Sequence, residues 1–321
     1  MSRIAPFLAI ARLSAVEAIR RPVFLLVALS GLAGIVALPF LLNYTLGDSA
    51  RIVRDSALAL GFSGGILLAA LGAGESIARD LRRGTAAAIL AKPVSRSAYF
   101  LAKVAGVWAA LFLYALAALA ATLLAVRAGA SDLRLDWTAA GPALLALFLA
   151  PVLAGAWNHR TRRPFTSAAF FLLLLFLLLA VAVSAAFRTP LDHLAFPSNF
   201  QWAIAPVALL LCFCLGMAAA LAAALATRLS VTPVLLLCAG FFLFGLMGDH
   251  LLGPRLADSG AARAAYALLP NVQAFWLLDA LDAAVPIPSA YFGLAAAYAV
   301  AWSAAALALG LASFHRLEIP G

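Results

Sequence analysis

The sequence predicts an all-α, polytopic helical membrane protein, and three observations lead to that fold class. The chain has 321 residues, 66% hydrophobic and 11% charged, with a mean hydropathy of +1.06. Soluble domains carry about 25% charged residues, so a chain this apolar needs lipid to cover its surface. Its apolar residues form continuous Ala- and Leu-rich runs rather than the short alternating segments of an outer-membrane barrel.

Eight runs are long enough to cross the membrane as helices, which takes about 20 residues each. We predict about eight transmembrane helices, at 22–43, 57–75, 98–126, 139–157, 165–187, 202–226, 231–249 and 289–314. Segment 1–21 before them is expected to be an interfacial helix, and no cleavable signal peptide is evident in it. Segment 250–288, which Pro and Gly residues interrupt, is expected to be external or re-entrant. The three cysteines fall in spans and are expected to be core residues.

The basic residues predict the orientation of these helices. With the N-terminus in the cytoplasm, 15 of the 22 Lys and Arg residues fall on the cytoplasmic side. Only 4 of the 13 acids lie there, which leaves the two sides with charges of +11 and −2. This asymmetry follows the positive-inside rule. It predicts that both termini are cytoplasmic, and it accounts for the net charge of +9 without a nucleic-acid partner.

Two short sequence motifs bear on the chemistry that this chain could perform. It lacks the G-x-x-x-x-G-K-[ST] loop that holds nucleotide phosphates, since its only lysines are Lys92 and Lys103. If ATP drives this protein, another chain binds it. GFSGG at 61–65 fits the G-x-S-x-G of serine hydrolases, but every histidine falls at a span end or in a loop, away from Ser63. The alternative interpretation is a close helix contact through Gly61 and Gly65.

One polar segment, 76–97, stands apart from the other loops. It contains ARDLRRGTAAAILAKPVSR (78–96), which combines charges with helix formers. A charged side chain costs about 2.5–3.5 kcal/mol at the centre of a membrane helix, so this segment is expected in water. A short helix parallel to the membrane, ended by Pro93, would display its charges to the cytoplasm. Composition leaves two interpretations open: a docking surface for a soluble partner, or a basic anchor on lipid headgroups.

The pattern from Glu75 to Lys103, E-x-x-x-x-D-L-R-R-G-T-x-x-x-I-L-A-K-P-V-S-R-x-x-Y-F-x-x-K, resembles type-2 ATP-binding-cassette (ABC) transporter permeases. In that family it lies between the second and third spans. LLPNVQAFWLLDAL (268–281) and the FHRLEI end after the last span are similar to these permeases as well. The pattern is nearest to permeases encoded beside the genes for copper-site maturation of nitrous oxide reductase. Because the spans hold no Met- or Cys-rich path for a soft metal, copper is not expected.

The resemblance implies a single transmembrane permease domain (1–321) of an ABC exporter in the bacterial inner membrane, without enzyme activity of its own. Segment 76–97 then corresponds to the coupling helix, which docks into a cytoplasmic P-loop ATPase. The implied partners are that ATPase, which holds ATP and Mg²⁺, a second permease copy and the lipid bilayer. This chain is expected to bind no cofactor or metal. Carried over by position, the contact with the ATPase is formed by Glu75, Arg79, Asp80, Arg82, Arg83, Gly84, Thr85, Pro93 and Arg96.

The sequence departs from that family in two places. Many members have an acid two positions before the glycine, where this chain has Arg82, and Asp80 is expected to take its role. The usual permease has six spans, so 139–187 is interpreted as an added hairpin whose turn, 158–163, is a further expected contact with the ATPase. Two other functions stay open: an intramembrane serine hydrolase that uses Ser63, and a non-transporting membrane scaffold.

Overall fold

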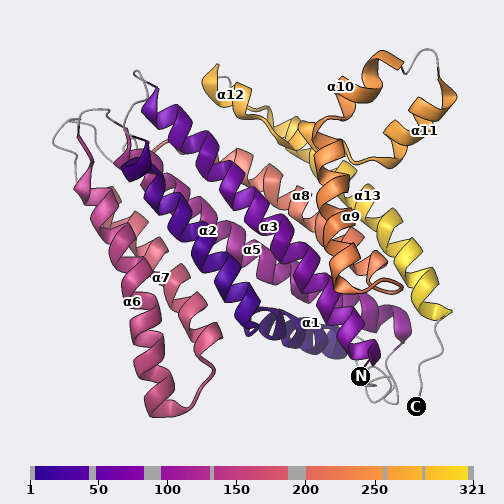
Figure 1. Ribbon diagram of the computed structural model, residues 1–321, viewed down its shortest axis with the longest axis horizontal. Helices are drawn as coiled ribbons and strands as arrows, with labels where there is room; N and C mark the ends of the chain where they lie inside the picture. Colours follow the sequence, from indigo (N-terminus) through magenta and orange to yellow (C-terminus); the bar gives the residue numbers. More distant parts are fainter. Residues whose placement is uncertain are drawn as a thin grey trace.

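The computed structural model of the chain is a bundle of long helices that run between two ends (Figure 1). It describes residues 4–42, 48–82, 95–130, 134–186, 200–255, 259–283 and 286–316, and no strand occurs in them. The predicted fold class, an all-α polytopic membrane protein, is confirmed. Seven described helices are long and apolar enough to cross a membrane: α2 (Pro22–Leu41), α3 (Ser49–Arg82), α5 (Arg96–Ala128), α6 (Trp137–Thr161), α7 (Phe165–Ala186), α8 (Ile204–Leu225) and α13 (Ser289–His315).

The predicted span at 231–249 forms a shorter helix, α9 (Val231–Leu246). Its 16 residues rise about 24 Å, which is less than the ~30 Å of a hydrocarbon core. α9 packs against α3 and α8, and the chain turns at Met247 into α10 (Gly248–Leu252). The eight predicted spans therefore correspond to seven long helices and one short one.

Local sequence sets several helix boundaries. Ser95 caps α5 by accepting the amide hydrogen of Ala98 at 3.2 Å, and Asp136 caps α6 in the same way. The α6–α7 connection is a tight turn in which Arg162 has a left-handed backbone conformation (φ 57°). Its amide donates to the carbonyl of Asn158 at 2.8 Å. The predicted tight hairpin therefore forms where the sequence places it.

The core consists of α3, α5 and α8, which pack against one another. Small residues of α3 allow this approach, because a Cβ atom at Gly64 would lie 2.3 Å from the Tyr114 hydroxyl oxygen of α5. A Cβ atom at Gly65 would lie 2.6 Å from Leu215 of α8. Tyr114 also donates its hydroxyl to the Gly61 carbonyl at 3.2 Å. The GFSGG stretch therefore forms a close contact between helices, which was the alternative to the serine hydrolase motif.

The outer helices expose apolar side chains. α6 pairs with α7, and α13 packs mainly on α8. Trp137 and Trp157, at the two ends of α6, are 63% and 52% exposed, and 20 residues separate them. That separation corresponds to about 30 Å, the thickness of a hydrocarbon core, and Trp is enriched at both membrane interfaces. Between them Phe148 is 70% exposed, so this surface suits lipid.

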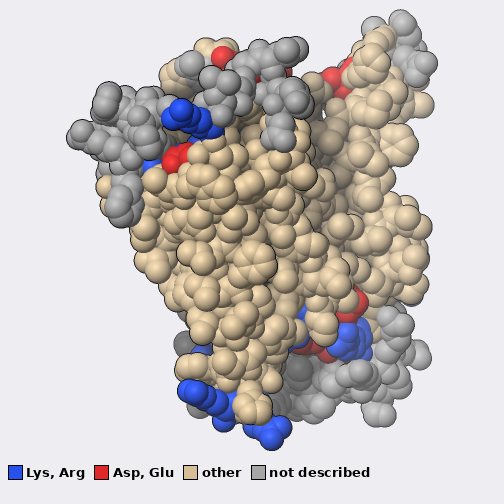
Figure 2. Space-filling view, turned by 60° about the vertical axis from the view of Figure 1, so that its left-hand side comes forward, with Lys and Arg blue, Asp and Glu red and all other residues tan. Residues whose placement is uncertain are grey.

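Helix ends and connections gather at two ends of the molecule, and charged side chains lie near both of them (Figure 2). We call one of them the basic end. α1 (Ile4–Ile19) and the end of α13 lie there (Figure 1). Contacts confirm the grouping: Arg21 pairs with Glu75, and Thr166 donates to the Arg20 carbonyl at 2.7 Å. Its described basic residues are Arg12, Arg20, Arg21, Arg79, Arg82, Arg96, Lys103, Arg160, Arg162, Arg163, Arg228 and Arg316.

The predicted broken segment lies at the opposite end (Figure 1). It is a series of short helices: α10, η1 (Gly253–Arg255), α11 (Gly260–Leu268), η2 (Gln273–Phe275) and α12 (Leu278–Asp282). Its middle returns to the bundle, where Val272 and Phe275 are fully buried and the Trp276 ring lies 5.6 Å from that of Phe62. Gly245 of α9 makes room for it, because a Cβ atom there would lie 2.5 Å from the Pro270 carbonyl oxygen.

Candidate functional site: an ion-pair network at the basic end

The residues predicted to contact an ATPase lie at the basic end where they are described. Glu75, Arg79 and Asp80 occupy the last turns of α3, which continues without a break through Arg82. The first part of the predicted coupling helix, 76–82, is therefore the end of a long helix. Arg96 is the first residue of α5. Four predicted residues lie outside the described residues: Arg83, Gly84, Thr85 and Pro93.

Glu75 joins α3 to the junction of α1 and α2. Its carboxylate accepts hydrogen bonds from Arg21 at 3.1 Å and from Arg79 at 2.8 Å. Arg79 lies one turn further along the same helix, whereas Arg21 lies between α1 and α2. Arg21 also pairs with Glu17 of α1 at 3.3 Å. Glu75 therefore couples the end of α3 to two other helices.

Lys103 of α5 is the second centre of the network. Its Nζ lies 2.6 Å from Asp80 Oδ2 of α3 and 3.2 Å from Glu17 Oε2 of α1. Tyr99, one turn earlier in α5, donates its hydroxyl to the same Asp80 carboxylate. The Lys103 side chain is only 5% exposed. A buried ammonium group needs such partners, because an unpaired buried charge is strongly destabilising.

A glycine brings α1 close enough to complete the network. A Cβ atom at Gly106 of α5 would lie 2.3 Å from the Ala11 carbonyl oxygen and 2.5 Å from Ser14 Cβ. Any larger residue at 106 would push α1 away from α5, and Glu17 would move away from Lys103 with it. The packing of α1 and the ion pairs therefore depend on each other.

The network is balanced in charge. It joins three carboxylates to three cations, and Arg79 is the most exposed of the six at 38%. Charges that compensate one another suit a rigid support better than a site that binds a free ion or transfers protons. Its six members are Glu17, Arg21, Glu75, Arg79, Asp80 and Lys103.

Sequence reasoning did not assign Glu17, Arg21, Tyr99 or Lys103 to this site. One signal was present: Lys103 falls within the predicted span 98–126, and an ionisable group in a span is costly and needs a partner. Which acid it meets is not encoded in local sequence, since Glu17 lies 86 residues away.

The start of α5 is held to the end of α13. Arg96 donates to the His315 carbonyl at 3.2 Å, and the Ser97 hydroxyl lies 3.2 Å from His315 Nε2. The segment that connects α3 to α5 therefore begins after Arg82, at the end of a helix that belongs to the network. It ends before Ser95, beside the end of α13.

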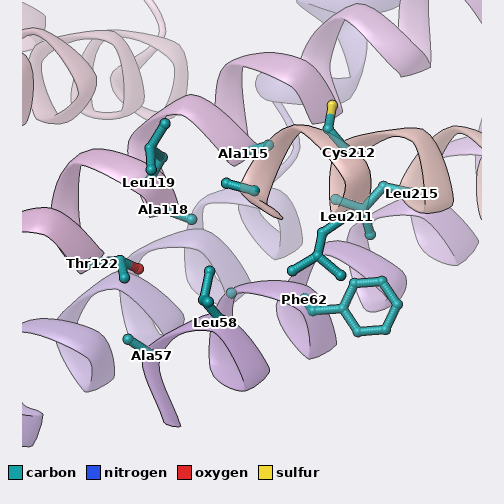
Figure 3. A pocket seen from close by; sticks show the side chains of 12 residues that line it. Ala57, Leu58, Phe62, Ala115, Ala118, Leu119, Thr122, Leu211, Cys212 and Leu215 are labelled. Carbon is teal, nitrogen blue, oxygen red and sulfur yellow. The ribbon is translucent and has the colours of Figure 1, made fainter. Parts of the chain in front are cut away.

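Ser63 does not lie in a catalytic arrangement within the described residues. Its side chain is exposed on α3, and it forms no hydrogen bond with any residue that the structure describes. The neighbouring Phe62 lines a cavity of about 30 Å³ between α3, α5 and α8, whose other walls are almost entirely apolar (Figure 3). A space of that size holds at most a water or two.

No protein-family model matches this chain, and no curated protein is significantly similar to it. In the described part of the chain, no group of three or more His, Cys, Asp or Glu residues is placed to hold a metal ion. The three cysteines are free and buried, as their place in the spans predicted. The features of this chain that bear on its function are therefore the geometry of the basic end and the pattern of residues around it.

Proposed function

We propose that this chain is the membrane-spanning permease subunit of an ABC exporter. Two copies act with two cytoplasmic ATPase subunits, which bind and hydrolyse ATP. The basic end faces the cytoplasm of a bacterium, in keeping with its excess of Lys and Arg. The observation that carries the proposal is the network at that end, because it joins both helices that flank segment 83–94 to α1.

The network determines how a displacement of that segment spreads. The segment connects α3 to α5, two helices of the core. Lys103 pairs with acids of both α3 and α1, and Glu75 is paired at the junction of α1 and α2. When the ATPase pair closes and pushes on the segment, these three helices move together, because bending one helix end alone would separate buried charges. α8 packs against α3 and α5, so the movement reaches it as well.

The described site residues divide into two roles in this proposal. Arg79 is partly exposed and uses only some of its five N–H donors on Glu75, so it is available to an acidic side chain of the ATPase. Asp80 points inward to Lys103 and Tyr99, with a side chain that is 12% exposed. We therefore propose that Asp80 holds the end of α3 against α5, next to the segment. The arginines around Asp80 would form the docking contact with the ATPase.

Co-purification tests the proposal. The chain is co-expressed with a candidate P-loop ATPase, the partner that the proposal requires, extracted in detergent and purified through a tag on the ATPase. The R82A/R83A/G84L variant is expected to lose most of the bound ATPase while it still inserts into the membrane. The matched control, R51A/R263A, removes two arginines from the opposite end and should retain the ATPase.

Cysteine labelling provides a second test. Arg83→Cys should react with a membrane-impermeant maleimide only from the cytoplasmic face. Labelling from the outer face, or unchanged association in the triple variant, would contradict the proposal.

A further inference from the structure

A groove of about 340 Å³ opens on the surface of the long helices, between α5, α8 and α13. Its walls are apolar, and they include Trp108 of α5, Phe213 of α8 and Val300 of α13. Trp108 is 45% and Val300 69% exposed, so the groove faces outward. All three helices are membrane-spanning candidates. An outward apolar groove at this depth meets hydrocarbon, and 340 Å³ lies within the size range of ligand sites.

Two glycines shape the groove. The Trp108 indole lies over Gly216 of α8, where a Cβ atom would be 2.4 Å from its Nε1. Closer to the basic end, Gly310 brings α13 against α8, because a Cβ atom there would lie 2.7 Å from Ala224 Cα. The groove lies on the side of Gly310 away from the basic end, and its lining on α13 runs from Leu307 to Ala296.

The same three helices present a cluster of cations at their basic ends. Arg96 begins α5, Arg228 follows α8, and His315 and Arg316 end α13. They converge, since Arg96 donates to the His315 carbonyl and Arg228 donates to the Ser313 hydroxyl at 2.8 Å. Arg228 and Arg316 are exposed and form no ion pair with any described residue. The guanidinium groups of Arg228 and Arg316 therefore have donors available for an anion.

The apolar groove and the cation cluster are spaced like the acyl chain and the phosphate of a phospholipid. Leu101, in the groove, lies five residues from Arg96, and Leu307 lies eight residues from His315. At 1.5 Å for each residue, the cations are about 8–12 Å beyond the apolar walls along the helix axes. A phosphate at the cations and an acyl chain in the groove satisfy this spacing together.

We infer that the groove between α5, α8 and α13 binds one acyl chain of an anionic phospholipid, whose phosphate lies on Arg228 and Arg316, within the positive field of the neighbouring Arg96. Basic pockets between transmembrane helices bind anionic headgroups in this manner. A second protein chain in the groove would use its apolar walls but would leave the cations unexplained. The inference concerns the leaflet at the basic end and holds whether or not the chain transports a substrate.

Quenching of Trp108 fluorescence tests the site. The full-length protein is reconstituted into phosphatidylcholine bilayers that contain increasing fractions of phosphatidylglycerol with brominated acyl chains. The Trp108 signal is the difference between wild type and W108F. Brominated phosphatidylglycerol should quench it at a lower mole fraction than brominated phosphatidylcholine does.

Charge variants identify the headgroup contact. Arg96→Gln and Arg228→Gln are each expected to raise the phosphatidylglycerol fraction for half-quenching about fivefold, since an Arg near an anionic surface contributes on the order of 1 kcal/mol. The matched control, R160Q/R163Q, removes charge from the exposed α6–α7 turn at the same end and should cause no shift. Equal quenching by the two lipids, with no change in the charge variants, would overturn the inference.

A variant that fills the groove tests the acyl chain. Ala304 lines the groove and is exposed, so A304F occupies it without disturbing the core. Native mass spectrometry should show phosphatidylglycerol retained by wild type and by the control L145F on α6, and lost from A304F. Circular dichroism confirms that each variant is folded. If wild type is a dimer that A304F converts to monomers, the groove is a protein interface and the inference fails.

Discussion

The two ends of the bundle are held by ion pairs of different kinds. At the basic end, Lys103 is 5% exposed and bridges two other helices through Glu17 and Asp80. At the opposite end, Asp282 of the short helix α12 lies 2.8 Å from Arg51 and 2.5 Å from Arg54 of α3. The Arg51 side chain is 55% exposed, so solvent screens its pair with Asp282, whereas the Arg54 side chain is 7% exposed and has a second acid, Asp55, beside it.

The difference lies in what happens when a pair opens. Separating Lys103 from its acids would leave a buried charge without a partner, which is strongly destabilising. Separating Asp282 from Arg51 returns both groups to water at little cost, and the buried Arg54, whose side chain is 7% exposed, keeps Asp55 as a partner at 2.8 Å. The basic end is therefore expected to move as one unit, whereas α12 can leave α3 while the buried Phe275 keeps its place. A rigid end and a releasable end are compatible with the proposed exporter, which would receive force at the basic end.

Removing the cation of the buried network should have the largest effect. Lys103→Met removes the cation that Glu17 and Asp80 share, and breaking a buried pair costs about 3–5 kcal/mol. Thermal unfolding in detergent, followed by circular dichroism, should show a large decrease in Tm. Arg51→Met, at the exposed pair, should change Tm little. Equal Tm values for the two variants would show that the ends do not differ in this way.

Filling the contact between α1 and α5 should have an intermediate effect. A Cβ atom in G106A would meet the Ala11 carbonyl oxygen at 2.3 Å, and overpacking of this kind costs about 1–3 kcal/mol. Ser14 is 2% exposed, so S14C should react slowly with a maleimide and much faster when combined with G106A.

The controls for that experiment are two glycines of α6. Gly141 and Gly155 have no atom within 4 Å of an added Cβ. G141A and G155A should leave the S14C labelling rate unchanged and stabilise α6 by up to about 1 kcal/mol, because Ala is the better helix former. A G106A variant that labels like these controls would show that α1 does not depend on Gly106.

Acidification should release α12 with a smaller effect. The hydrogen bond from Arg54 holds the pKa of Asp282 below its ordinary value. The contribution of this carboxylate to stability is therefore fully present above the unfolded-state pKa of about 3.9, and is lost as pH falls through the lower folded-state value. Spin labels on α12 and α3 should move apart below about pH 4. D282N should show the separated state at every pH. A separation in wild type that begins near neutral pH would show that protonation of Asp282 does not cause it.

Replacing Ser63 should have the smallest effect. Ser63→Ala removes an exposed hydroxyl that bonds to no described residue, so stability and ATPase association are expected to stay as in wild type. A fluorophosphonate should not label the wild-type chain. Labelling that disappears in Ser63→Ala would favour the serine hydrolase over the permease.

Hydropathy predicted most of the fold, and its errors at the two ends of one helix are instructive. The span predicted at 98–126 is α5 (Arg96–Ala128), within two residues at each end. The span predicted at 57–75 extends from Ser49 to Arg82, because the charges beyond both of its predicted ends are paired, among them Arg54 with Asp282 at the start. Glu75 meets Arg21 and Arg79, and Asp80 meets Lys103. Hydropathy treats each side chain as unpaired, so it places such residues in water.

The sequence by itself determined that this protein is a bundle of membrane-spanning helices, approximately where most of the long helices run, and which end of the bundle is basic. Those properties follow from the free energy of transferring each segment into lipid, which depends on local composition. Only the tertiary structure decided which charges meet, that α1 packs along α5 at Gly106, and that a groove opens beside a cluster of cations. These contacts join residues far apart in the chain, and their energies arise only when the helices pack.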